Sequence, residues 1–214
     1  MFAQTAIYNF DMAAFLKKWV VDVRDAQADD GRFPDFAPHP FGKNERFAGA
    51  PGWGDAGVVV PWRAYENYGD TRILADHFDA AVRWVEFIRR ENPDLLWTKK
   101  RGNDYGDWLS GDTLVAEGWP RKGAEVPKEV FATAMFAHST DLVARMAGVL
   151  GKDAEARKYR GLFDEITKPD NVQKLGQDIK SGLKLGIHGT PAFFVNGQLF
   201  HGTIPAETIA RYLN

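Results

Sequence analysis

The sequence predicts a mainly α-helical chain made of two unlike parts, and three observations support this fold class. Before about residue 167, apolar residues recur at three- and four-residue steps, which is the spacing of one helix face. Long loops rich in Trp, Asp and Gly separate these segments. From about residue 168 the pattern changes, and an apolar run before Asn196-Gly197 indicates a β-hairpin. We therefore expect two domains, at residues 1-167 and 168-214.

Four helices are expected in the first part, because their apolar positions share one face and their ends carry capping residues or glycine. They cover about residues 12–23, 73–88, 130–150 and 153–166. Residues 58–68 are ambiguous, since the three valines from Val58 favour a strand whereas the aromatic residues that follow are helically spaced. Pro61 is compatible with a first helical turn or with a kink.

The second part is expected to form a small αββα unit. A short helix over about residues 172–183 precedes a strand at 192–195, a two-residue Asn-Gly turn and a return strand at 198–200. A final helix is expected from about Thr203, with Pro205 in its first turn.

Composition excludes several function classes. The net charge is −2 and no stripe of Lys and Arg follows one face, so we expect no nucleic-acid partner. The chain has no cysteine, which excludes thiol redox chemistry and thiolate metal sites, and its five histidines lack ligand spacing. We therefore expect no metal and no cofactor. The sequence shows no signal peptide and no apolar stretch long enough for a bilayer, so we expect no membrane partner and a cytoplasmic location.

One motif resembles a dinucleotide-binding fingerprint and is rejected. Residues 52–57 match G-x-G-x-x-G, but the residues before them are typical of a loop, whereas the fingerprint must follow a strand. Trp53 occupies a position where a small residue normally lets a pyrophosphate approach, and the carboxylate of Asp55 would repel it.

A different set of motifs closely resembles the α-L-rhamnosidase family of inverting glycoside hydrolases. The motifs occur in the family's order over about three-quarters of the chain: Tyr8 to Phe15, Arg32 to Pro38, Gly49 to Ala56, Val60-Pro61-Trp62, Asn103 to Leu109 and Thr133 to Ser139. The resemblance implies a six-hairpin α/α toroid with a cup at one face. The first part of this chain would then be an incomplete toroid.

The resemblance also implies which residues line the cup, namely Asp35, Trp53, Asp55, Asp107 and Trp108. Carboxylates accept hydrogen bonds from sugar hydroxyls, and indole faces stack on the apolar side of a pyranose ring. Each tryptophan taken alone is equally compatible with simple packing. Together, beside aspartates in Gly-rich loops, they favour an L-rhamnose-containing glycan as the partner.

The same resemblance predicts that both catalytic carboxylates are missing. Inverting glycosidases need a general acid and a general base roughly 6.5–9.5 Å apart. In the family the acid lies in a motif that normally precedes the position of Met1, and the base lies well beyond the helix that contains His138. Glu45 imitates the acid motif but stands too far from Trp53, and we interpret it as a solvated loop charge. No catalytic residue is therefore expected, and we predict an inactive glycosidase segment.

The last part of the chain resembles DsbA-like, thioredoxin-fold oxidoreductases in residues 178–197. This resemblance implies a cis bond between Thr190 and Pro191. It leaves a second functional hypothesis, a non-catalytic peptide-binding or interaction module without redox cysteines. A chimeric frame with no selected function is a third hypothesis. Under each of these hypotheses, incomplete domains leave apolar helix faces without partners, so self-association is expected.

Overall fold

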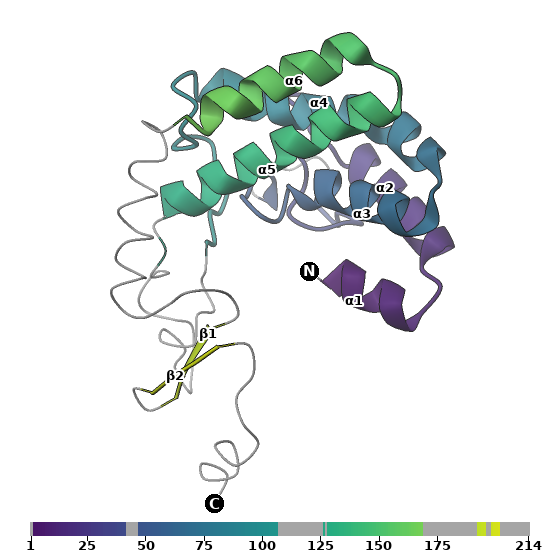
Figure 1. Ribbon diagram of the computed structural model, residues 1–214, viewed down its shortest axis with the longest axis horizontal. Helices are drawn as coiled ribbons and strands as arrows, with labels where there is room; N and C mark the ends of the chain where they lie inside the picture. Colours follow the sequence, from purple (N-terminus) through teal and green to yellow (C-terminus); the bar gives the residue numbers. More distant parts are fainter. Residues whose placement is uncertain are drawn as a thin grey trace, which may run out of the picture. The chain divides into compact units, whose positions relative to one another are not determined.

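The computed structural model describes residues 2–41, 47–106, 126, 128–168, 192–195 and 198–201. The chain divides into two compact units, Met1–Lys168 and Pro169–Asn214, which are considered separately below. The described part of the first unit is helical, and that of the second unit is a β-hairpin (Figure 1). The mainly α prediction is therefore confirmed, and it is consistent with a six-hairpin glycosidase fragment.

The first unit holds six described helices. They are α1 (Phe2–Asn9), α2 (Ala13–Asp25), α3 (Ala56–Tyr68), α4 (Thr71–Glu91), α5 (Lys128–Val149) and α6 (Asp153–Ile166). The four predicted helices correspond to α2, α4, α5 and α6. The start of α4 is capped by Asp70, whose side chain accepts a hydrogen bond from the backbone N–H of Arg72, as the sequence indicates.

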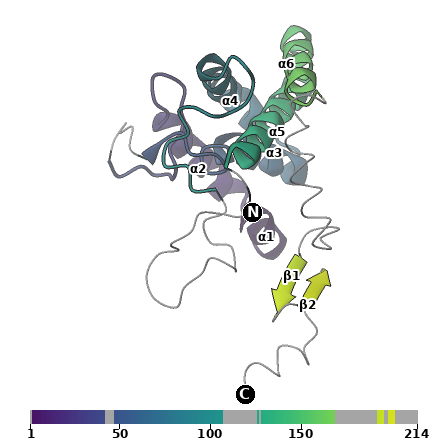
Figure 2. The ribbon, with the colours of Figure 1, turned by 90° about the vertical axis from the view of Figure 1, so that its left-hand side faces the viewer.

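From α2 onward, helices that are neighbours in the sequence pack against one another. Two residues connect α3 to α4, and three connect α5 to α6, so each pair forms a helical hairpin (Figures 1 and 2). α4 packs on both α3 and α5 and carries the centre of the core, where Leu74, Trp84 and Val85 are fully buried. α1 has much less packing, and among the described helices its main contact is with α3.

The ambiguous segment at residues 58–68 belongs to helix α3, with Pro61 inside it. Proline has no N–H, so the carbonyl of Gly57 lacks the donor that an uninterrupted helix would supply. The ring of His77, on α4, provides a substitute: its Nε2 lies 2.7 Å from that carbonyl oxygen. A tertiary contact therefore satisfies the polar group that the proline exposes.

The second unit contains strand β1 (Ala192–Val195) and strand β2 (Gln198–His201), which pair antiparallel. Phe193 lies opposite Phe200 in the register, and the predicted hairpin is confirmed. The helices expected on either side of it, and the expected cis bond at Thr190-Pro191, lie outside the described residues. Antiparallel hairpins occur in many folds, so this one does not support the thioredoxin-like assignment.

Among the described residues, no helix combines the length and the apolar character that crossing a bilayer requires. Within the same residues, no group of three or more His, Asp or Glu side chains is arranged to hold a metal ion.

Candidate functional site

Three loops converge on the carboxylate of Asp35; two of them are parts of the connection between α2 and α3, and the third is part of the connection between α4 and α5. Its Oδ1 atom accepts a hydrogen bond from the backbone N–H of Ala50 at 3.1 Å. Its Oδ2 atom accepts from the amide of Asn103 at 3.2 Å and from the hydroxyl of Tyr105 at 3.4 Å. Asp35 is only 6% exposed, so these partners replace most of its hydration. The convergence defines the candidate site.

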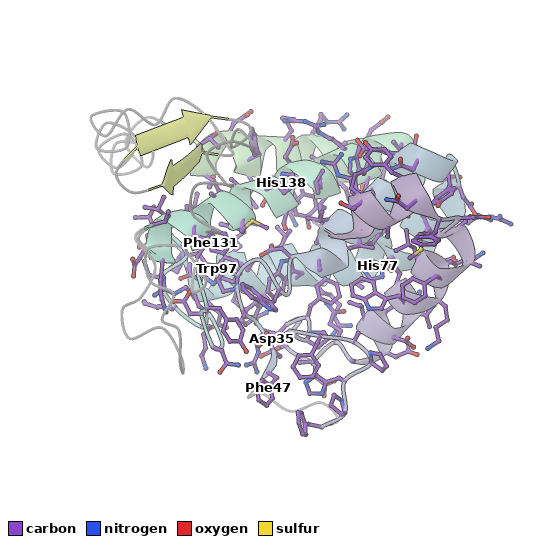
Figure 3. All side chains as sticks on the ribbon, turned by 90° about the horizontal axis from the view of Figure 1, so that it is seen from below. Asp35, Phe47, His77, Trp97, Phe131 and His138 are labelled. Atoms are coloured by element: carbon purple, nitrogen blue, oxygen red, sulfur yellow. The ribbon has the colours of Figure 1, made fainter. Side chains whose placement is uncertain are left out.

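Backbone contacts explain why the first two loops meet. Pro34 and Ala48 form an isolated antiparallel bridge, and the backbone N–H of Asp35 donates to the carbonyl of Phe47 at 2.8 Å. Figure 3 shows Asp35 and Phe47 side by side. The register of this bridge places the Asp35 side chain against the turn that begins at Ala50.

The third loop approaches because Gly102 has no side chain. A Cβ atom at Gly102 would lie 2.6 Å from the carbonyl oxygen of Ala48, closer than any real side chain tolerates. Its φ of +56° is also a conformation that favours glycine. Gly102 thus lets Asn103 and Tyr105 reach Asp35.

Trp53 forms an aromatic wall of the site. Its ring centroid lies 4.6 Å from that of Tyr105, with an interplanar angle of 43°. The side chain of Trp53 is half-buried, so part of the indole remains accessible. The structure thus brings Trp53 and Asp35 together through Tyr105, which contacts both.

Asp55 lies directly beneath the turn that carries Trp53 and has no exposed surface. Its Oδ2 atom accepts from the backbone N–H of Gly52 at 2.8 Å, and its Oδ1 atom accepts from Trp84 Nε1 at 2.9 Å and from Ser139 Oγ at 2.6 Å. The carboxylate therefore ties the turn that carries Trp53 to α4 and α5.

Burial raises the pKa of both carboxyls, because a low-dielectric surrounding disfavours the charged form. At Asp35 the increase in pKa is opposed by the hydrogen bonds from Ala50, Asn103 and Tyr105 and by the charge of His39. At Asp55 the pKa is raised by burial against the hydrogen bonds from Ser139, Gly52 and Trp84. In each case the donors offset part of the cost of keeping a buried carboxylate ionised.

The sequence identified only part of this arrangement. Asp107 and Trp108, the other two predicted cup residues, lie outside the described residues, as does Glu45. Asn103 and Tyr105 were not among the predicted site residues, although they stand in the motif that leads to Asp107. The signal available in the sequence was their polar character immediately before a predicted site residue.

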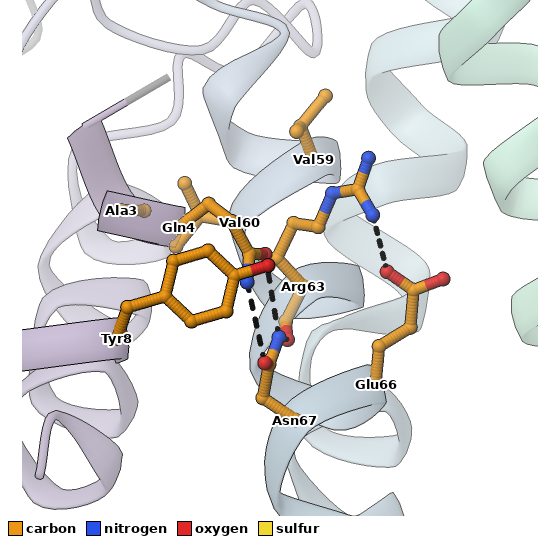
Figure 4. Close-up of a pocket in the computed structure, with 8 residues that line it drawn as sticks. All are labelled: Ala3, Gln4, Tyr8, Val59, Val60, Arg63, Glu66 and Asn67. Atoms are coloured by element: carbon orange, nitrogen blue, oxygen red, sulfur yellow. Dashed lines mark hydrogen bonds and ion pairs between the residues drawn. The ribbon is translucent and has the colours of Figure 1, made fainter. Parts of the chain in front are cut away.

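A second concave surface lies between α1 and α3, in a different place from the three loops. It is a shallow groove of about 680 Å³ lined by residues such as Tyr8, Arg63 and Asn67 (Figure 4). Gln4 and Asn67 exchange amide hydrogen bonds across it, and Arg63 pairs with Glu66 at 2.7 Å. The polar side chains of Gln4, Arg63, Glu66 and Asn67 are thus already paired within the groove.

Comparisons with known proteins all point to one family. The family described as the bacterial alpha-L-rhamnosidase 6 hairpin glycosidase domain matches residues 1–174. An alpha-L-rhamnosidase of Streptomyces avermitilis is 43% identical over 180 residues, which is 84% of this chain and 16% of that protein. One of Formosa agariphila is 31% identical over 168 residues, covering 78% of this chain and 17% of that protein. The chain therefore spans less than a fifth of the length of these relatives.

Solved structures give the same result. The crystal structure of the Streptomyces avermitilis alpha-L-rhamnosidase complexed with L-rhamnose is 44% identical, with a TM-score of 0.58 over 73% of this chain and 13% of that chain. The alpha-L-rhamnosidase from Aspergillus terreus is 30% identical, with a TM-score of 0.64 over 77% of this chain and 18% of that chain. None of these matches is to a thioredoxin-fold protein, so they give the DsbA-like interpretation no support.

Proposed function

Because the chain belongs to the bacterial α-L-rhamnosidase six-hairpin glycosidase family, we propose that it carries part of a sugar-binding cup that recognises L-rhamnose. The observation that carries the proposal is the convergence of three loops on the nearly buried carboxylate of Asp35. The relative from Streptomyces avermitilis, which is complexed with L-rhamnose, supports the choice of sugar.

In the proposed cup, Asp35 and Trp53 contact the sugar directly. Asp35 accepts a hydrogen bond from a hydroxyl group, and the accessible part of the Trp53 indole stacks on the apolar side of the pyranose. Asp107 and Trp108 complete the proposed cup, as their motif alone indicates.

The role of Asp55 differs from the direct contact that the resemblance implies. Its carboxylate has no exposed surface and already accepts three hydrogen bonds. We therefore assign it an indirect part in the cup, in which it fixes the turn that carries Trp53.

We further propose that the chain binds the sugar without hydrolysing it. Inverting hydrolysis needs one carboxylic acid that protonates the leaving oxygen and one carboxylate that activates water. Asp35 and Asp55 are both occupied by protein donors, and Asp55 has no access to a water molecule at the surface. Neither carboxyl group is placed to carry out such a step.

Isothermal titration calorimetry with L-rhamnose tests the binding proposal. Replacing Trp53 with alanine removes the stacking surface, and we expect affinity to fall roughly tenfold or more. Tyr8→Ala is the matched control, because Tyr8 is an exposed aromatic residue in the groove between α1 and α3. If Tyr8→Ala abolishes binding and Trp53→Ala leaves it intact, the sugar site is not in the three loops.

Release of nitrophenol from an aryl α-L-rhamnoside tests the absence of hydrolysis. We expect no turnover above background, with or without substitutions at Asp35. Turnover that disappears on changing Asp55 or Asp107 alone would contradict this part of the proposal.

The alternative of a peptide-binding module in residues 168-214 remains a sequence-based prediction, as does that of a chimeric frame with no selected function. The hairpin of β1 and β2 supplies strand edges, to which an extended peptide can add. Peptide binding that is lost on deleting residues 190–201 would favour the module over the sugar-binding cup.

A further inference from the structure

We infer that Asn103 and Tyr105 are positioning residues, which orient Asp35 and Trp53 as one unit for contact with a sugar. That Asp35 and Trp53 contact the sugar rests on the proposed function. The coupling between the two side chains rests on the geometry. Neither residue belongs to the set that the resemblance implies as cup residues.

The side chains of Asp35, Asn103 and Tyr105 form a closed ring of three hydrogen bonds. The Asn103 amide nitrogen lies 3.2 Å from Asp35 Oδ2 and 3.0 Å from the Tyr105 hydroxyl oxygen. An amide NH2 group has two protons, so it supplies both bonds. The single proton of the Tyr105 hydroxyl then points toward Asp35 Oδ2, at 3.4 Å. Two of the three bonds thus reach Asp35 Oδ2, and the third joins Asn103 to the Tyr105 hydroxyl oxygen.

This arrangement leaves the two oxygens of Asp35 in different situations. Oδ2 accepts both side-chain bonds, whereas Oδ1 accepts a backbone bond from Ala50. The contact to the Tyr105 hydroxyl is the longest of these bonds and is therefore the weakest. We therefore expect a sugar hydroxyl to donate to Oδ1, beside the bond from Ala50, while Asn103 and Tyr105 hold Oδ2.

The backbone at Asp104 explains how its two neighbours reach the same carboxylate. Asp104 has a φ of +44°, a left-handed conformation that aspartate tolerates better than most residues. Its own carboxylate pairs with Arg101 at 3.0 Å, while Asn103 and Tyr105 contact Asp35. Arg101 also pairs with Glu129 on α5 at 3.2 Å. The charge of His39 also lowers the pKa of the Asp35 carboxyl.

Tyr105 links the polar and the aromatic parts of the site. Its hydroxyl contacts Asp35, and its ring lies against that of Trp53 with centroids 4.6 Å apart. Tyr105→Phe therefore separates the two contacts, since phenylalanine keeps the ring and removes only the hydroxyl. Tyr65→Phe is a matched control, because Tyr65 lies on α3 and its ring packs against that of Trp62, with centroids 5.5 Å apart.

The first experiment needs no sugar. The pKa of the Asp35 carboxyl is measured by carbon NMR in the unaltered protein and in Tyr105→Phe, Asn103→Ala and Tyr65→Phe. Removing a donor to the carboxylate destabilises its charged form, so we expect the pKa to rise in Tyr105→Phe and to rise further in Asn103→Ala. Tyr65→Phe leaves it unchanged. An Asp35 pKa that is the same in all four proteins would overturn the inference.

The second experiment measures L-rhamnose affinity in the same proteins at neutral and acidic pH. We expect the affinity to fall roughly three- to tenfold in Tyr105→Phe, more in Asn103→Ala, and not in Tyr65→Phe. The pH at which affinity is lost rises in the same order. If the unaltered protein does not bind L-rhamnose, the proposed function fails while the pKa measurement still decides whether the coupling exists. Affinities that fall equally in all three variants would show general disturbance of the fold and contradict a positioning role.

Discussion

At the residue scale, His77 supplies a hydrogen-bond donor to a backbone carbonyl that Pro61 leaves without one. Pro61 removes a donor from α3, and the His77 ring lies 2.7 Å from the carbonyl oxygen of Gly57 that would have accepted it. The ring is fully buried and stacks on Phe33 with centroids 5.5 Å apart. Burial lowers the pKa of His77 to about 4, so the ring is neutral at pH 7 and carries its proton on Nε2.

This lowered pKa predicts an acid-sensitive contribution to stability. The unfolded chain binds a proton at His77 near pH 6.5, whereas the folded chain binds it only near pH 4. The free energy of unfolding therefore falls as pH decreases from about 6.5 to 4, by about 3 kcal/mol in total from this residue.

Urea denaturation at several pH values checks the prediction, with His77→Gln as the reference. Glutamine supplies an N–H donor for the Gly57 carbonyl but does not titrate. The raised pKa values of Asp35 and Asp55 act in the opposite direction in both proteins, so they cancel in the difference. Parallel stability curves for the two proteins between pH 6.5 and 4 would contradict the assignment.

At the scale of elements, Asp55 connects three parts of the fold. Its carboxylate joins the turn at Gly52 to Trp84 on α4 and Ser139 on α5. Replacing Asp55 with alanine leaves these buried donors without an acceptor, and we expect a loss of roughly 3–5 kcal/mol in unfolding free energy. Ser139→Ala removes one donor and should cost about 1–2 kcal/mol. Equal losses in the two variants, measured by denaturation, would show that Asp55 does not act as the common acceptor.

The helices and loops also differ in how well the sequence alone predicts them. Local periodicity was sufficient to predict α4, where a regular apolar face follows a capping aspartate at residue 70. It was insufficient for α3, because the contact that accommodates Pro61 comes from His77 on another helix. It was also insufficient for Asn103 and Tyr105, whose partner Asp35 lies about seventy residues away in the chain. Contacts between distant loops leave no periodic signal.

At the scale of the whole molecule, self-association remains a prediction, and the exposed aromatic side chains around α1 are the place to test it. Tyr8 and Phe10 are 78% and 69% exposed, and Phe15 at the start of α2 is 59% exposed. Large exposed apolar surfaces commonly mediate association. Sedimentation velocity should therefore show an apparent mass that rises with concentration. In the double variant Phe10→Asp and Phe15→Asp, we expect the mass of the monomer. A mass of one chain at all concentrations in the unaltered protein would contradict the prediction.

We predict that this chain contains a folded sugar-binding site. Thermal unfolding, followed by the fluorescence of its seven tryptophans, tests it most directly when L-rhamnose in large excess is compared with an equal concentration of D-glucose. A ligand that binds only the folded state stabilises it by RT ln(1 + [L]/Kd), or about 2.7 kcal/mol at a hundred times Kd. We expect a cooperative transition that L-rhamnose moves to higher temperature and D-glucose does not. A transition that is unchanged by L-rhamnose, or moved equally by both sugars, would contradict it.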